Sequence, residues 1–212
     1  MPRRWESGRT EAFSDGVFAI AITLLVLDLH VPQTEFHDLW RGILHEWPAY
    51  LAYVTSFTAI GGLWLAHHGI FHRLRFVNDQ VMRINLLLLM GVSFLPFPTR
   101  LMSEAIRSED AARVAVIFYG ISLFLVGALG AALWGAVVRD RDLLNPGVTD
   151  REVRQVTLAL TPHLGFYVGA TIFAIFFPRG AAVLYLVIAV LGVIRARPDT
   201  DSDSDVVTTR SK

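Results

Sequence analysis

The chain has no cysteine among its 212 residues, and only one of its 19 basic residues is a lysine. Without thiols it cannot form disulfides, thiolate metal sites or cysteine nucleophiles. Its formal net charge of zero argues against a nucleic-acid partner. It also lacks a phosphate-binding loop, a nucleophile elbow, a zinc-binding helix motif and the filter sequence Thr-Val-Gly-Tyr-Gly. The sequence therefore offers no evidence for a soluble enzyme.

Apolar sequence is abundant instead: 53% of the residues are hydrophobic and the mean hydropathy is +0.47. A helix needs about 20 mostly apolar residues to cross a bilayer. Runs of about that length occupy residues 13–31, 48–72, 82–102, 113–138, 156–177 and 180–195. We therefore predict an all-α, polytopic membrane protein with six transmembrane helices within residues 1–197 and no soluble domain. The acidic tail, residues 198–212, is expected to be disordered in the cytoplasm.

Basic residues are distributed unevenly between the two sides that these spans define. The two termini and the second and fourth loops carry 14 of them, and the other three loops carry 5. By the positive-inside rule, both termini are then cytoplasmic. Six spans also place both ends on one side, so the two arguments agree.

The first apolar run carries an aliphatic stripe. At about 100° per residue, Ile20, Leu24 and Leu27 lie on one face, with Thr23 beside them. Rings of such side chains from several subunits would form stacked apolar constrictions that control ion dehydration. The same stripe would also suit packing in a core. Asp28, near the outer end, would make an acidic ring that attracts cations, or be an ordinary interfacial residue.

A polar triplet, Phe13-Ser14-Asp15, opens the same run. A carboxylate this close to the hydrocarbon is costly unless it has a partner. Asp15 could be a favourable charge near a helix start. Arg9, His67 and Asn85 lie at matching depth, however, and predict a polar network with Asp15.

Histidines suggest two alternatives. His68 and His72 are one turn apart, a spacing that suits a metal-binding helix, but no carboxylate pair joins them. A histidine-liganded membrane metalloenzyme therefore stays open as the weaker alternative. The other is a proton-coupled carrier in which Asp15 and His67 relay protons. No internal inverted repeat supports that carrier.

Several short motifs follow one another along the first three spans. They are Arg9, Phe13-Ser14-Asp15, residues 16–23, Trp64 with His67 and Phe71, then Asp79, Asn85 and Phe94-Leu95-Pro96. In this order and spacing the chain resembles the transmembrane protein 175 family of potassium channels, found in endolysosomes and prokaryotes. The last three spans match that family only in number and hydropathy.

This resemblance implies a potassium-preferring cation channel that is not an enzyme and needs no cofactor beyond the permeant K⁺. The first helix would line the pore of a homotetramer, with Ile20 at the narrowest point, Leu24 and Leu27 as further layers, and Thr23 among them. The resemblance also implies structural anchors, which are Arg9, Phe13, Ser14, Asp15, Trp64, His67 and Asn85. The arginine-rich composition favours a bacterial plasma membrane as the location.

Overall fold

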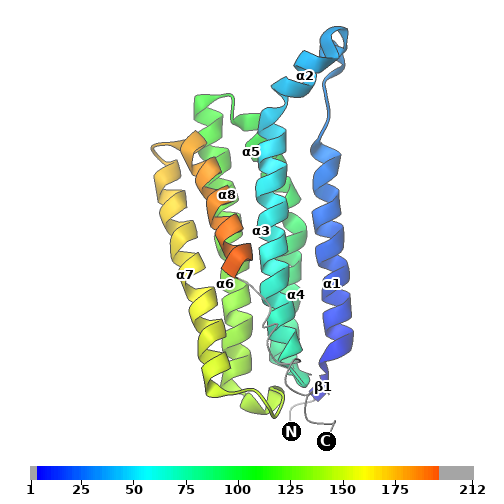
Figure 1. The fold of residues 1–212 in the computed structure, drawn as a ribbon, viewed down its shortest axis with the longest axis vertical. Coiled ribbons are helices and arrows are strands. Elements are labelled where there is room, and N and C mark those ends of the chain that lie inside the picture. The colour runs from blue at the N-terminus through cyan, green and yellow to red at the C-terminus, as the bar shows by residue number, and fades with distance from the viewer. Residues whose placement is uncertain (1–3, 196–212) are drawn as a thin grey trace, which may run out of the picture.

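The computed structural model describes residues 4–195, without the side chains of residues 33–35 (Figure 1). Within that range, six helical segments are long and apolar enough to cross a membrane. They are α1 (Ser7–Leu24) with the 3-10 turn η1 (Leu25–Asp28), α3 (Trp47–His72), α4 (Asp79–Phe94) with α5 (Pro96–Ala105), α6 (Glu109–Arg139), α7 (Asp150–Ala174) and α8 (Pro178–Arg195). The prediction of an all-α polytopic membrane protein is confirmed. The acidic tail lies outside the described residues.

All six predicted spans differ from the observed helices at one or both ends, and the first and third show the physical reasons most clearly. The first helix begins at Ser7 rather than residue 13, because polar residues extend it beyond the apolar run, and it ends at Asp28 rather than 31. The third predicted span, 82–102, is divided between α4 and α5. Pro96 has no N–H to donate to the preceding turn, so the helix breaks there and restarts with proline in its first turn.

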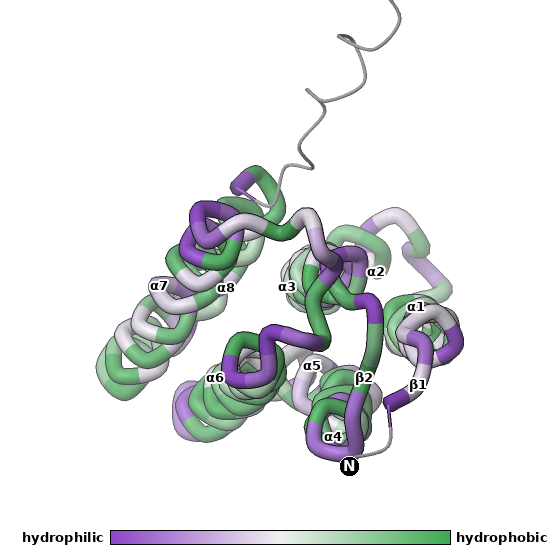
Figure 2. Tube along the Cα trace, turned by 90° about the horizontal axis from the view of Figure 1, so that it is seen from below, coloured by the Kyte–Doolittle hydropathy of each residue, from purple (hydrophilic) through white to green (hydrophobic). Residues whose placement is uncertain are grey.

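The helices form an elongated bundle with α1 at one end (Figures 1 and 2). Helix α1 packs on α3 and α4, α3 packs on α8, and α6 packs on α7. Figure 2 places α7 and α8 on the side away from α1. The helix that carries the aliphatic stripe is therefore covered by its own chain on one side only.

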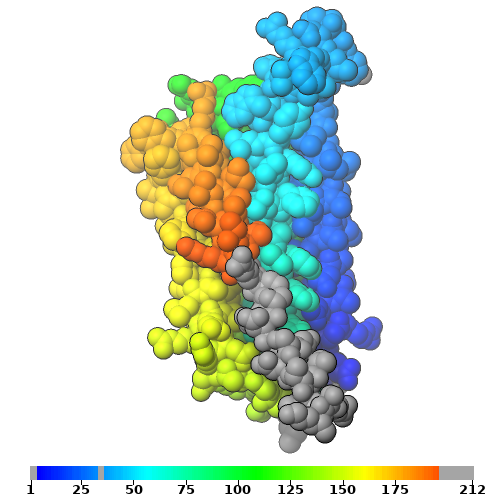
Figure 3. Space-filling model, in the orientation of Figure 1, coloured from blue at the N-terminus to red at the C-terminus, as the bar shows by residue number. Residues whose placement is uncertain are grey.

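An arm projects from the end of the bundle opposite the N-terminus (Figures 1 and 3). It consists of η2 (Gln33–Asp38) and α2 (Leu39–His45), and the Asp38 carboxylate caps α2 by accepting from Arg41 N at 3.2 Å. Its large apolar side chains, such as Leu39 and Trp40, are exposed.

At the other end of the bundle, a short antiparallel ribbon holds the segment that precedes α1. Strand β1 (Arg4–Glu6) pairs with β2 (Phe76–Asn78), which precedes α4. The Ser7 hydroxyl donates to Leu74 O at 2.9 Å, and Arg4 forms ion pairs with Asp140 and Asp142 in the α6–α7 loop. This ribbon was not predicted from the sequence.

Close packing joins α6 to its neighbours in the core. A Cβ on Gly120 would lie 2.0 Å from the Tyr185 hydroxyl and 2.3 Å from Thr171 Oγ1. Near it, Ser56 Oγ lies 2.7 Å from Thr99 Oγ1 and 2.9 Å from the Tyr119 hydroxyl. The core therefore combines a close helix approach with satisfied polar groups.

Candidate pore helix and its polar contacts

Helix α1 has one buried and one exposed face. Ser14, Phe18, Ala21 and Leu25 are buried and recur every three or four residues, so they form the stripe that packs on α3 and α4. Phe18 lies against the rings of α3, with its centroid 5.3 Å from that of His67. This buried stripe fixes which way the rest of α1 faces.

The predicted aliphatic stripe lies on the exposed face. Ile20, Leu24 and Leu27 are 61%, 42% and 73% exposed in the single chain. They span about 10 Å along the helix at 1.5 Å per residue. Thr23 is exposed beside them, and its hydroxyl donates to Ile20 O at 2.9 Å. We call Ile20, Leu24 and Leu27 the α1 ridge. These side chains do not pack into the core of the single chain.

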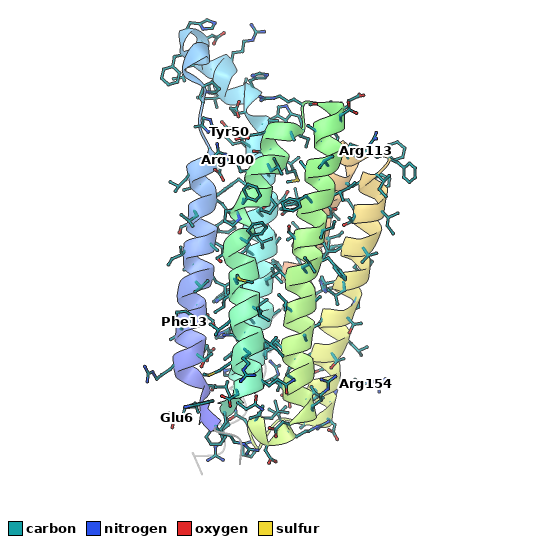
Figure 4. The ribbon with its side chains drawn as sticks, turned by 180° about the vertical axis from the view of Figure 1, so that it is seen from behind. Glu6, Phe13, Tyr50, Arg100, Arg113 and Arg154 are labelled. Carbon is teal, nitrogen blue, oxygen red and sulfur yellow. The ribbon has the colours of Figure 1, made fainter. Side chains whose placement is uncertain are left out.

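At the C-terminal end of the α1 ridge, Asp28 is the last residue of η1 and is half-buried. It interacts electrostatically with Arg100 and Glu104 of α5, which pair with each other at 2.8 Å (Figure 4). A cation, Arg100, and an anion, Glu104, of the same chain therefore both act on Asp28, the residue predicted to lie at the pore mouth.

A chain of buried hydrogen bonds holds the N-terminal half of α1. The His67 Nε2–H donates to Asn85 Oδ1 at 2.9 Å, and Asn85 Nδ2 donates to Ser14 Oγ at 3.0 Å. The Ser14 hydroxyl in turn donates to Thr10 O at 2.8 Å. All three side chains are 2% exposed or less. Residues from α1, α3 and α4 thus bond to one another where water is excluded. Within the described residues, the buried His67 Nδ1 has no hydrogen-bond partner.

Asp15 makes a separate contact. Its carboxylate accepts from Trp64 Nε1 at 2.8 Å, and no hydrogen bond within residues 4–195 joins it to Arg9, His67 or Asn85. Neighbouring helical residues point about 100° apart, so Ser14 faces α4 while Asp15 faces α3. Arg9 is exposed and takes no part in these bonds. The expected partners of Asp15 are therefore corrected to Trp64.

Phe13, which was predicted to anchor α1, does not pack in the core. Its side chain is 58% exposed in the N-terminal half of α1 (Figure 4). It lines a surface pocket with Arg9 and Met82 instead of packing into the bundle.

The histidines of α3 have separate surroundings. His68 Nδ1 lies 3.1 Å from the Glu11 carboxylate of α1, and its ring stacks on Trp64 and on His72. Across the described part of the chain, no group of three or more potential ligands is placed to hold a metal ion. The Glu11–His68 contact was not predicted from the sequence, although Glu11 lies in the N-terminal half of α1 and His68 lies near the C-terminal end of α3.

Six apolar spans define a multi-pass membrane protein. Its first helix packs on the bundle with one face and carries the exposed α1 ridge on the other. The profile of the family described as "Endosomal/lysosomal potassium channel TMEM175" matches residues 9–96. That range contains all the predicted pore and anchor residues.

Relatives extend the match beyond that range. A potassium channel of Streptomyces collinus is 44% identical over 144 residues, which are 68% of this chain and 70% of the relative. A potassium channel of Chamaesiphon minutus is 41% identical over 80% of this chain and 84% of the relative. The crystal structure of a lysosomal potassium-selective channel TMEM175 homolog from Chamaesiphon minutus superposes with a TM-score of 0.82 at 36% identity, covering 91% and 98% of the two chains. The protein belongs to the TMEM175 family, whose members are channels and not enzymes.

Proposed function

We propose that this protein is a passive, potassium-preferring cation channel of the bacterial plasma membrane. Residues 1–197 would form one channel unit, and four copies would surround a central pore lined by α1, with both termini in the cytoplasm. The observation that carries the proposal is the exposed α1 ridge, on the face opposite the buried polar contacts. Family membership supports it, because both bacterial relatives are named potassium channels.

In this arrangement, Ile20, Leu24 and Leu27 form three stacked apolar rings. Ions that pass such rings lose part of their hydration shell, so the width of the Ile20 ring decides whether conduction occurs. The Thr23 hydroxyl donates to its own backbone, which leaves oxygen lone pairs available to a passing cation. Asp28 raises the cation concentration at the mouth, moderated by the neighbouring Arg100.

The buried contacts of α1 have a structural role in the proposal. Ser14, Asn85 and His67 hold one side of the helix, and Asp15 with Trp64 holds another. Opening requires α1 to rotate or tilt far enough to widen the Ile20 ring while these contacts persist or exchange. Arg9 and Phe13, which are exposed, are not assigned to this anchoring set.

Reconstituted flux tests the assignment. Liposomes containing the full chain are assayed with K⁺, Rb⁺, Cs⁺ and Na⁺, for wild type and Ile20→Asn. We expect the variant to conduct more and to discriminate less between K⁺ and Na⁺, because an amide replaces the dehydrating ring. Ile172→Asn is the matched control, since Ile172 is similarly exposed, at 55%, but lies on α7. Unchanged currents and permeability ratios in Ile20→Asn would reject the pore assignment.

The carrier alternative is tested by the same preparation. No hydrogen bond within the described residues joins Asp15 to His67, the pair expected to relay protons. A channel gives a current that reverses at the potassium equilibrium potential without proton dependence. A saturating, proton-coupled flux would favour the carrier.

A further inference from the structure

A groove lies between α6 and α7. Figure 2 places α7 on the side of the bundle away from α1. The volume of the groove is about 300 Å³, and its walls come from the C-terminal half of α6 and the N-terminal half of α7. Ala131, Gly135 and Val138 line it from α6, and Leu160 and Thr161 line it from α7. This surface is remote from the proposed pore and has no part in the function proposed above.

Two glycines of α6 show why the groove is open. A Cβ on Gly127 would lie 3.1 Å from Leu164 of α7, so the two helices touch there. A Cβ on Gly135 would meet no atom within 4 Å. The close contact seen at Gly127 is thus absent at Gly135, about 12 Å further along α6 at 1.5 Å per residue, and the open space there forms part of the groove.

The polar groups in the groove wall are already satisfied by the protein. Trp134 Nε1 donates to Thr157 Oγ1 at 2.9 Å, and the Thr157 hydroxyl donates to Val153 O at 2.9 Å. The Thr161 hydroxyl donates to Thr157 O at 2.7 Å. With these hydrogens engaged, the wall presents mainly hydrocarbon, which suits an apolar chain and disfavours a polar solute.

Positive charge lies at the mouth of the groove. Arg139 is the last residue of α6 and lines the groove, and Arg154 is one helical turn before Thr157 on α7 (Figure 4). Neither arginine has an ion-pair partner within residues 4–195. The nearby acidic residues are engaged elsewhere: Asp140 pairs with Arg4, and Asp150 pairs with Arg141.

We propose that this groove is a binding site for an anionic phospholipid. One acyl chain would lie between α6 and α7, and the phosphate would accept hydrogen bonds from Arg139 and Arg154. Arginine suits this task because its planar fork can donate two parallel bonds to a phosphate. From Ala131 to Val138 the groove runs about 10 Å along α6, against a leaflet hydrocarbon depth of about 15 Å. Its apolar length and charged mouth thus match the order of tail and headgroup in one leaflet.

Native mass spectrometry of the detergent-solubilised full chain tests this proposal. The probes are phosphatidylglycerol and phosphatidylcholine with identical acyl chains, titrated separately and in competition. We expect wild type to retain phosphatidylglycerol about tenfold more strongly, because two arginines near the headgroup favour the anionic lipid. Arg139→Gln/Arg154→Gln should reduce phosphatidylglycerol binding to the phosphatidylcholine level. Arg113→Gln, at the other end of α6, should leave the preference unchanged (Figure 4).

Filling the groove tests the acyl-chain half of the proposal. Gly135→Phe should weaken both lipids, whereas Gly130→Phe should not, since Gly130 also faces open space but does not line the groove. Ala131→Phe provides a second filling variant if Gly135→Phe elutes as aggregate on size exclusion. Inorganic phosphate at equal concentration should not displace phosphatidylglycerol.

Three results would overturn the site. They are equal retention of the two lipids by wild type, an equal loss in Arg113→Gln, and displacement by phosphate alone, which would indicate a simple anion site. None depends on ion conduction, so failure here leaves the channel proposal standing.

Discussion

Trp64 of α3 donates its indole N–H to the carboxylate of Asp15 on α1 at 2.8 Å. The bond joins the helix that bears the α1 ridge to its largest neighbour, close to the depth of the buried Ser14–Asn85–His67 chain. Two independent polar contacts, on adjacent residues of α1, therefore restrain the rotation of this helix. The restraint leads to separate predictions for each contact.

Asp15→Ala is expected to impair assembly more than ion preference. The substitution leaves the partly buried Trp64 N–H without its acceptor, and the full cost of about 1–3 kcal/mol for a buried donor is its upper bound. The oligomer fraction on size exclusion should fall, and the K⁺/Na⁺ permeability ratio of the surviving channels should stay as in wild type. Asp110→Ala, an exposed carboxylate in the first turn of α6, is the control. A well-folded tetramer with altered ion preference would contradict the anchoring role.

Ser14 and Asn85 should be energetically coupled. Asn85→Ala removes the partner of both Ser14 and His67, so its melting temperature in detergent should fall further than that of Ser14→Ala. In the double variant the losses should be smaller than the sum of the single ones, with a coupling of about 0.5–3 kcal/mol. Strict additivity would show that the chain is not one unit.

Gly120→Ala should strongly reduce the yield of folded protein. The added methyl group would overlap the Tyr185 hydroxyl and Thr171 Oγ1, at 2.0 and 2.3 Å from its carbon. Overpacking of this kind typically costs about 1–3 kcal/mol or more. Gly130→Ala, with open space around it, makes the same chemical change and should elute as wild type. Equal elution profiles for both variants would disprove the close approach of α6 to α8.

Arg4→Gln should change stability only slightly. Arg4 and Asp140 are each about one-third exposed and Asp142 is 76% exposed, so solvent screens both ion pairs. Exposed pairs contribute about 0–1 kcal/mol, and that contribution should vanish at 1 M salt. Melting curves at low and high salt check this, with Arg83→Gln, exposed on α4, as control. A loss that persists in high salt would indicate a role beyond charge.

Much of the fold could be predicted because membrane spans are long and apolar. The helix starts could not be predicted as well: residues 7–12 are mostly polar, and hydropathy does not reveal a helix that continues beyond the apolar run. The β1–β2 ribbon was missed for another reason. Strands of three residues separated by about 70 positions leave no periodic pattern to detect.

Five of the seven predicted anchor residues contact neighbouring helices, whereas Arg9 and Phe13 are exposed. Ser14, Asp15, Trp64, His67 and Asn85 all lie at the contacts of α1 with α3 and α4. Which side chain meets which depends on the rotation of each helix, and a single residue of offset moves a side chain by about 100°. Depth along the helix, which the sequence does provide, could not distinguish Ser14 from Asp15 as the partner of Asn85.

The ribbon at the start of α1 offers a way to observe the helix move. Because β1 runs directly into α1 and is paired residue by residue with β2, we expect a rotation of α1 about its axis to displace Phe76–Asn78 as well. The natural chain has no cysteine. A single cysteine introduced in β2 would therefore be a unique attachment point for a spin label or fluorophore, reporting motion of the α1 helix without any label placed on it.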